Sequence, residues 1–195
     1  MKHIVYTSLI NPENSPAVFA PEHVITEKML KDSGVSHTIL RNNIYTDMLL
    51  MKLPHVISSG TLGALAGNGG VGYVTREDCA RAAAAALSAS GNESRTYEIT
   101  GPAVIGYTDL AAIASAIGGK PVSYVAVAPE ILRKAFSPAY AELLVSLEYT
   151  IAQGKLAVAT SDVKTLTGRD PQTVAAFLEQ HRAELLAAPQ KKAAS

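Results

Sequence analysis

The sequence predicts an α/β protein built around a mainly parallel sheet. Short β-branched and apolar segments, typical of strands buried on both faces, alternate with longer segments of helical periodicity. The composition agrees, because 48% of the 195 residues are hydrophobic and only 17% are charged. This content predicts one sizeable core and excludes disorder over most of the length.

The first strand–helix–strand unit occupies the start of the chain. HIVYTSL (3–9) and SHTILRN (36–42) are the two strand candidates. Residues 21–33 between them have helical periodicity, with Pro21 suited to the first helical position and Gly34 to the stop. These lengths fit one βαβ unit, whose connection we expect to be right-handed.

The middle of the chain is expected to be more irregular. Residues 44–58 form an apolar, Met-rich stretch, read as helical and broken near Pro54, and a glycine-rich loop follows over 60–72. A helix should begin after Thr75, because Thr75 and Asp78 have nearly the spacing of a capping box.

The later segments predict a smaller, mainly helical lobe of α+β type. We therefore divide the chain into a sheet-containing part over 1–100, a lobe over 101–187 and a disordered tail over 188–195. The expected strands of this region are 95–102 and 121–127, and the expected helices are 108–118, 128–136, 137–154 and one from about Gln172.

The bulk properties exclude several classes of function. Seventeen basic residues balance seventeen acidic ones, so nothing points to a nucleic-acid partner. No apolar run approaches the ~18 residues that cross a membrane, and the first residues turn polar too soon for a signal peptide. The lone cysteine fits a reducing compartment, so a cytoplasmic protein is expected. No H-E-x-x-H or C-x-x-C motif occurs, and no metal site is expected.

Several motifs occur together in one order. They are VYTSL, EHVITEKMLKDSG, TILRNNIYTDML, TREDCARAAAAAL and SDVKTLTGRDPQTVAAFLEQH. This series resembles the NmrA-like atypical short-chain dehydrogenases, and within them the NADPH:quinone oxidoreductases of the second type and the triphenylmethane reductases. The resemblance covers nearly the whole chain.

The resemblance implies a Rossmann-like sheet with a small substrate lobe, and NADPH as the cofactor. In that family a glycine-rich loop after the opening strand binds the dinucleotide, but no G-x-x-G-x-x-G stands at the front of this chain. The chain opens at what should be the fourth strand. GALAGNGGVG (63–72) precedes the nearest confident strand, so it is expected to be a flexible loop, and NADPH binding is expected to be weak.

The candidate site residues follow the two strands. By the resemblance, Thr7 and Ser8 lie beside the nicotinamide, although a strand-end cap is the alternative. Asn42 offers both a donor and an acceptor to a carboxamide, and Asn43 is grouped with it as cofactor-binding. Tyr45 is expected to donate to a quinone oxygen or to stack on a flat ring.

His23 is the principal catalytic candidate, together with Tyr45. By the resemblance, His23 takes the place of the Lys of the usual Y-x-x-x-K helix motif. The Tyr position is Phe19, which cannot donate a proton. Helical spacing places Glu27 on the same face, where it is expected to orient His23, while Lys28 lies off that face. The alternative for His23 is a surface histidine in the first helical turn.

Four further features have plain structural interpretations beside functional ones. Arg41 suits an ion pair as well as a site, and Cys79 in its Ala-rich helix suits an inert thiol. Residues 48–51 suit an apolar wall for an aromatic acceptor, or plain core. The apolar first strand suits an exposed edge, through which we expect a homodimer or another association.

Three functions fit these observations. The first is an NADPH-dependent reductase of quinones or similar flat aromatic acceptors, or the substrate-side part of one. The second is a non-catalytic, dinucleotide-sensing or protein-binding regulator of the NmrA kind. The third is a truncated product that folds without a function of its own. Turnover of a quinone with NADPH separates the first from the other two.

Overall fold

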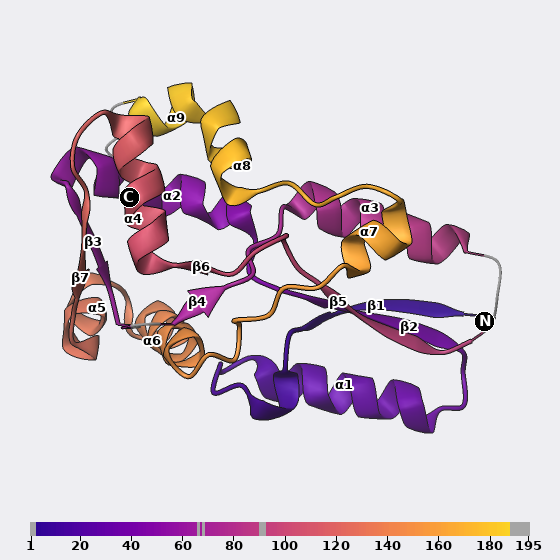
Figure 1. The fold of residues 1–195 in the computed structure, drawn as a ribbon. Coiled ribbons are helices and arrows are strands. Elements are labelled where there is room, and N and C mark those ends of the chain that lie inside the picture. The colour runs from indigo at the N-terminus through magenta and orange to yellow at the C-terminus, as the bar shows by residue number, and fades with distance from the viewer. Residues whose placement is uncertain (1–2, 66, 68, 90–92, 188–195) are drawn as a thin grey trace.

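The computed structural model describes residues 3–65, 67, 69–89 and 93–187. The predicted tail over 188–195 lies outside them. The elements form two groups, one around a three-stranded sheet and one mainly helical (Figure 1). The sheet has the order β1-β2-β5 and is parallel throughout, as predicted. Its strands are β1 (Ile4–Leu9), β2 (His37–Asn42) and β5 (Arg95–Ile99).

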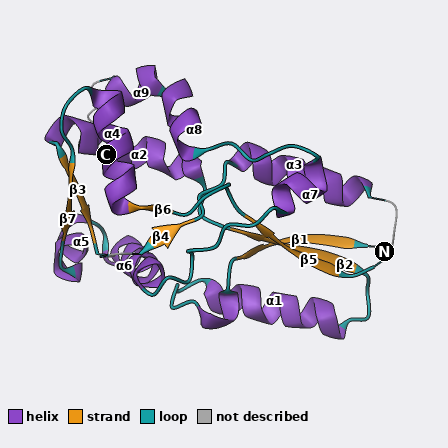
Figure 2. Ribbon diagram, viewed as in Figure 1, coloured by secondary structure: helices purple, strands orange, loops and turns teal. Residues whose placement is uncertain are grey.

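Helices cover both faces of this sheet. α1 (Ala20–Asp32) lies on one face, and α3 (Arg76–Ser88) lies with α7 (Asp162–Thr167) on the other (Figure 2). The hydroxyl oxygen of Thr75 accepts a hydrogen bond of 3.0 Å from the backbone N–H of Asp78, so the predicted cap of α3 is confirmed. No helix was predicted at α7. The sheet group is therefore a three-layer α/β arrangement.

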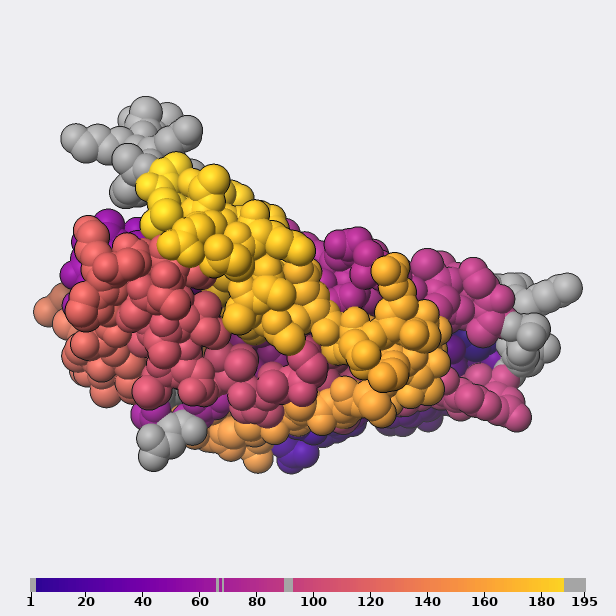
Figure 3. All heavy atoms as spheres, turned by 45° about the horizontal axis from the view of Figure 1, so that its top comes forward, coloured from indigo at the N-terminus to yellow at the C-terminus, as the bar shows by residue number. Residues whose placement is uncertain are grey.

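The second group is mainly helical and contains two small strand pairs. β3 pairs with β7 in parallel, and β4 pairs with β6 in antiparallel orientation. The last helices lie across the surface beside α4 (Figure 3). Beside α1 of the sheet group lies η1 (Pro12–Asn14). The elements of the second group are η2 (Thr46–Met48), α2 (Leu49–Ser59), β3 (Thr61–Ala64), β4 (Gly70–Val71), β6 (Ile105–Gly106), α4 (Tyr107–Gly118), β7 (Ser123–Ala126), α5 (Pro129–Ala135), α6 (Pro138–Ala152), α8 (Val174–Gln180) and α9 (Arg182–Leu186).

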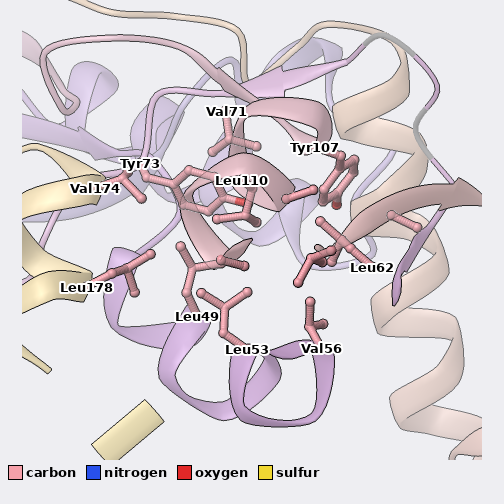
Figure 4. Packing of buried hydrophobic residues seen from close by; sticks show 14 of the residues in the cluster. Leu49, Leu53, Val56, Leu62, Val71, Tyr73, Tyr107, Leu110, Val174 and Leu178 are labelled. Carbon is pink, nitrogen blue, oxygen red and sulfur yellow. The ribbon is translucent and has the colours of Figure 1, made fainter. Parts of the chain in front are cut away.

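The largest core cluster lies in this second group. Leu53, Val56 and Leu110 are among its buried side chains, with Leu178 closing it from α8 (Figure 4). This packing explains why the expected break near Pro54 is wrong: α2 runs through Pro54 from Leu49 to Ser59. A proline costs an internal helix about 3 kcal/mol, and the burial of several apolar side chains of about 1.5–3 kcal/mol each offsets that cost.

Two other expectations about the elements are wrong. The glycine-rich stretch over 60–72 is not simply a loop, because it contains two short strands, β3 (Thr61–Ala64) and β4 (Gly70–Val71). The first strand is not buried on both faces: Thr7 is exposed. Within the described residues β1 hydrogen-bonds β2 alone, so it is an edge strand with a neighbour on one side.

The open side of β1 can be assigned from its backbone. The N–H groups of Ile4 and Ile10 donate to Ser36 and Asn42 on the β2 side. In a parallel ladder the N–H direction alternates along the strand, so the N–H of Val5 faces the open edge. An unpaired apolar edge is a site of association.

We predict that the chain forms a two-fold dimer through antiparallel pairing of β1 with its copy. Val5→Pro removes an edge N–H while sparing the β2 ladder, and it should give a monomer. Size-exclusion chromatography with light scattering at micromolar concentration measures this. Val5→Ala is the control. It loses side-chain packing against the buried cluster that includes Leu40 and Ala82, but it keeps the backbone N–H. A monomeric native chain, or a Val5→Pro dimer, contradicts the prediction.

Candidate functional site

A cavity of about 260 Å³ opens at the carboxyl ends of β1 and β2. It lies between the start of α1, the segment around η2 and one face of α6, so both groups of elements contribute to its walls. Ligand sites of open α/β sheets lie at this end of the strands. The lining residues are Thr7, Ser8, Leu9, Phe19, His23, Asn42, Asn43, Ile44, Tyr45, Met48, Tyr140, Leu143, Leu144 and Leu147.

The structure brings all of the predicted site residues to this one cavity. Thr7 and Ser8 come from the end of β1, and Asn42 is the last residue of β2. His23 reaches the cavity from the first turns of α1, and Tyr45 from the loop before η2. Asn43, which directly follows Asn42 in the chain, completes the set. Parallel strands end at the same edge of a sheet, which is why residues distant in sequence meet here.

Asn42 lines this cavity and has a buried acceptor without a partner. Its side chain is 7% exposed, and its Nδ2 donates to the Tyr45 hydroxyl at 3.3 Å. Its Oδ1 has no hydrogen-bond partner in the described part of the chain. A buried acceptor without a partner costs about 1–3 kcal/mol, so a ligand that donates to Oδ1 recovers that free energy.

Ser8 also offers the cavity only acceptor capacity. Its hydroxyl donates to Oε1 of Glu27 at 2.7 Å, which commits its proton. The remaining lone pairs of Ser8 Oγ can therefore accept a hydrogen bond, whereas the hydroxyl cannot donate a second one.

Glu27 is a buried carboxylate beneath the site, with 2% of its side chain exposed. Oε1 accepts from Arg41 Nε at 2.9 Å, and Oε2 accepts from Arg41 Nη2 at 2.6 Å. Burial raises the pKa of Glu27, but the hydrogen bonds from Arg41 and Ser8 and the charge of Arg41 outweigh burial and leave that pKa below its usual value. The guanidinium thus holds Glu27 ionised.

This network corrects the expectation that Glu27 orients His23. Glu27 is turned to the sheet by its bidentate pair with Arg41. The structural interpretation of Arg41 is confirmed, since Arg41 also pairs with Glu13 and does not line the cavity. Lys28 forms an exposed ion pair with Asp32, which agrees with its expected place off the site.

The partner of His23 is a residue that the sequence did not indicate. Nδ1 of His23 and the hydroxyl of Tyr6 lie 2.8 Å apart. The ring of Phe19 lies edge-on to the imidazole, with 6.3 Å between the ring centroids. Alternation along β1 places Tyr6 and Ser8 on the α1 face, which is the only sequence signal for this contact.

The amide of Asn43 is occupied by structural hydrogen bonds. Its Nδ2 donates to the backbone carbonyl of Leu156 at 3.0 Å, and its Oδ1 accepts from the N–H of Ile44 at 2.9 Å. Asn43 is 3% exposed and ties the end of β2 to the segment that follows α6. Its role toward a cofactor remains a prediction.

One apolar wall of the cavity was missed by the sequence reasoning. Tyr140, Leu143, Leu144 and Leu147 line it, all from α6. Their spacing is that of one helical face, but periodicity alone does not distinguish a cavity wall from core. The Met-rich stretch over 48–51 was expected to be a cavity wall or plain core, and its residues differ. Met48 lines the cavity, Leu49 is buried in the core, and Met51 is 75% exposed to solvent.

The described residues contain neither a reactive thiol nor a cluster of side chains that could hold a metal ion. Cys79 is buried, and burial together with the charges of Asp78 and Asp47 raises its pKa to about 12. A thiol of that pKa stays protonated and unreactive at neutral pH. Among residues 3–65, 67, 69–89 and 93–187, no group of His, Cys, Asp and Glu side chains could hold a metal ion. No helix described there is long and apolar enough to cross a membrane.

The fold and the position of the cavity together define a Rossmann-like α/β protein. Quinone oxidoreductase 2 of Escherichia coli is 41% identical over 124 residues, which are 64% of this chain and 43% of that protein. The crystal structure of the NADPH-dependent quinone oxidoreductase QOR2 from E. coli matches with a TM-score of 0.87 at 32% identity, covering 92% of this chain and 67% of that one.

A third comparison agrees with these two. Triphenylmethane reductase from Citrobacter sp. matches with a TM-score of 0.82 at 29% identity, covering 92% of this chain and 65% of that one. No family model matches the chain. The chain belongs to the NmrA-like atypical short-chain dehydrogenases, with E. coli quinone oxidoreductase 2 and an NmrA-like oxidoreductase of Aspergillus flavus among its relatives. It spans less than half the length of the curated E. coli relative.

Proposed function

We propose that this chain forms the acceptor side of an NAD(P)H-dependent reductase of quinones or similar flat aromatic compounds. The observation that carries the proposal is one cavity whose lining combines polar side chains with an apolar helix face. The polar side chains, here called the polar end, are Ser8, His23, Asn42 and Tyr45, and one apolar face comes from α6. Hydride transfer needs mainly positioning of two flat rings and a donor for the negative charge that develops on the acceptor.

The polar end fits the carboxamide of a nicotinamide. A carboxamide NH₂ offers two donors, and two residues that line the cavity have acceptors with free capacity, Ser8 Oγ and the buried Asn42 Oδ1. These two residues would hold the carboxamide and thereby set the orientation of the ring. When bound, the dihydronicotinamide supplies the hydride.

The rest of the cavity fits an apolar, planar acceptor. The side chains of Leu143, Leu144 and Leu147 offer hydrocarbon surface without competing polar atoms. The Tyr45 hydroxyl accepts from Asn42, so its own proton remains available to a quinone oxygen. His23 supplies a second polar group at the same end.

The relatives support the same class of chemistry. One solved structure is that of E. coli QOR2 complexed with NADPH, and the chain covers 65% of it at 32% identity. The NAD(P)H azoreductase of Xenophilus azovorans is 28% identical over 194 residues, which are 96% of this chain and 68% of that protein. The chain covers about two thirds of each of these two proteins.

The proposal predicts a specific loss of activity on substitution of His23. In a fusion carrying the dinucleotide-binding part of E. coli quinone oxidoreductase 2, His23→Ala should lower kcat/KM for quinone reduction by about ten-fold or more, the low end for a proton-donating group. Oxidation of NADPH followed by absorbance measures this.

Lys28→Ala is the matched control on the same helix, because Lys28 lies outside the cavity in an exposed ion pair. It should change kcat/KM by less than about two-fold. Equal effects of the two substitutions would show that α1 presents a different face to the acceptor.

A further inference from the structure

The contact between Tyr6 and His23 sets the chemical state of a cavity residue. Nδ1 of His23 lies 2.8 Å from the Tyr6 hydroxyl, which makes no other hydrogen bond to the residues described. The other ring nitrogen, Nε2, has no hydrogen-bond partner among those residues. His23 lines the cavity and Tyr6 does not.

The direction of this hydrogen bond follows from the two groups. A phenol is a good donor and a weak acceptor, and an unprotonated imidazole nitrogen is a good acceptor. If Nδ1 carried the proton, the O–H of half-buried Tyr6 would have no acceptor among the described residues. The bond is therefore donated by Tyr6 to an unprotonated Nδ1.

We infer that Tyr6 is a positioning residue that fixes His23 in the neutral tautomer with its proton on Nε2. A neutral imidazole carries one proton, so an accepting Nδ1 requires Nε2–H. With Nδ1 held by β1, the ring edge that carries Nε2 is left for the cavity. His23 then acts as a hydrogen-bond donor to a carbonyl oxygen, as a quinone presents.

This inference rests on the proposed function for its ligand, but not for the tautomer. Tyr6 would have no direct contact with the acceptor. Its effect should appear only with ligands that carry an oxygen acceptor, because the apolar walls are unchanged by loss of the Tyr6 hydroxyl.

The tautomer is tested by nitrogen NMR of the whole chain with labelled histidine, at mildly alkaline pH where free imidazoles are neutral. The His23 signals are assigned by their loss in His23→Gln. In the native chain we expect Nε2 in the protonated range and Nδ1 in the unprotonated range. In Tyr6→Phe both signals should move toward intermediate, exchange-averaged positions. A proton on Nδ1 in the native chain, or unchanged signals in Tyr6→Phe, overturns the inference.

The ligand effect is tested by titrating the same chains with menadione and with its hydrocarbon counterpart, methylnaphthalene. Tyr6→Phe should weaken menadione binding about three- to ten-fold, the value of one hydrogen bond, and leave methylnaphthalene binding unchanged. Tyr97→Phe is the matched control, because Tyr97 is a half-buried tyrosine on β5 outside the cavity. Equal loss for both ligands would mean that Tyr6 only supports the fold.

Failure of menadione to bind the native chain would count against the proposed function alone. The NMR result would still decide the tautomer.

Discussion

Glu27→Ala is expected to lower the free energy of unfolding by about 3 kcal/mol. Removing one partner of a buried ion pair costs about 3–5 kcal/mol, because the other charge is left without compensation. Here Arg41 has only 13% of its side chain exposed and Ser8 also loses its acceptor. Arg41 keeps its pair with half-exposed Glu13, so the low end of the range applies. Urea unfolding followed by circular dichroism measures the change.

Two variants separate the buried charge from other effects. Glu27→Gln keeps the shape and an acceptor for Ser8 but removes the charge, so its loss should be smaller than that of Glu27→Ala. Lys28→Ala, which breaks an exposed pair on the same helix, should cost less than about 1 kcal/mol. An equal, small effect of all three substitutions would contradict a stabilising role for the network.

The same carboxylate should make stability depend on acid. The pKa of Glu27 in the folded chain lies below its ordinary value of 4.5. Its contribution is therefore fully present above that ordinary value and is lost as the pH falls through the lower, folded-state pKa. The free energy of unfolding should decline more steeply below about pH 4.5 in the native chain than in Glu27→Gln.

NADPH should bind the 195-residue chain at least ~100-fold more weakly than it binds E. coli quinone oxidoreductase 2. A dinucleotide gains much of its affinity from pyrophosphate bound at a glycine-rich turn and the following helix amino terminus. The glycine-rich residues of this chain lead from β3 into β4, not into a helix. A few missing charge-assisted hydrogen bonds of about 1.5–3 kcal/mol each account for the expected loss.

Isothermal titration of the chain and of E. coli quinone oxidoreductase 2 gives both dissociation constants. Nicotinamide mononucleotide, which lacks the pyrophosphate, is a useful second ligand: its affinity should differ little between the two proteins. A low-micromolar dissociation constant of NADPH for the chain alone would show that some other part of the molecule holds the phosphates.

Local signals in the sequence predicted the first βαβ unit and the residues that meet at its carboxyl end. Short β-branched, apolar runs predicted β1 and β2, and the parallel topology then required Ser8 and Asn42 to be neighbours. The cap at Thr75 followed from a three-residue spacing, which is short enough to be specified by the chain itself.

The missed features depend on contacts between distant segments. Helical spacing put His23 and Glu27 on the same face of α1, but it did not show that Arg41 holds the carboxylate. The continuation of α2 through Pro54 needed the core beneath it. Likewise, no local pattern could show that Tyr6 meets His23 or that one face of α6 closes the cavity.

The polar and the α6 side chains that line the cavity come from two separate segments of the sequence. The polar groups lie between residues 7 and 45, whereas the apolar face of α6 lies between residues 140 and 147. Under the proposed function, selection on the shape of the acceptor can alter Leu143, Leu144 or Leu147 without disturbing the polar side chains. The substrate range would then change through one helix while the polar groups stay constant.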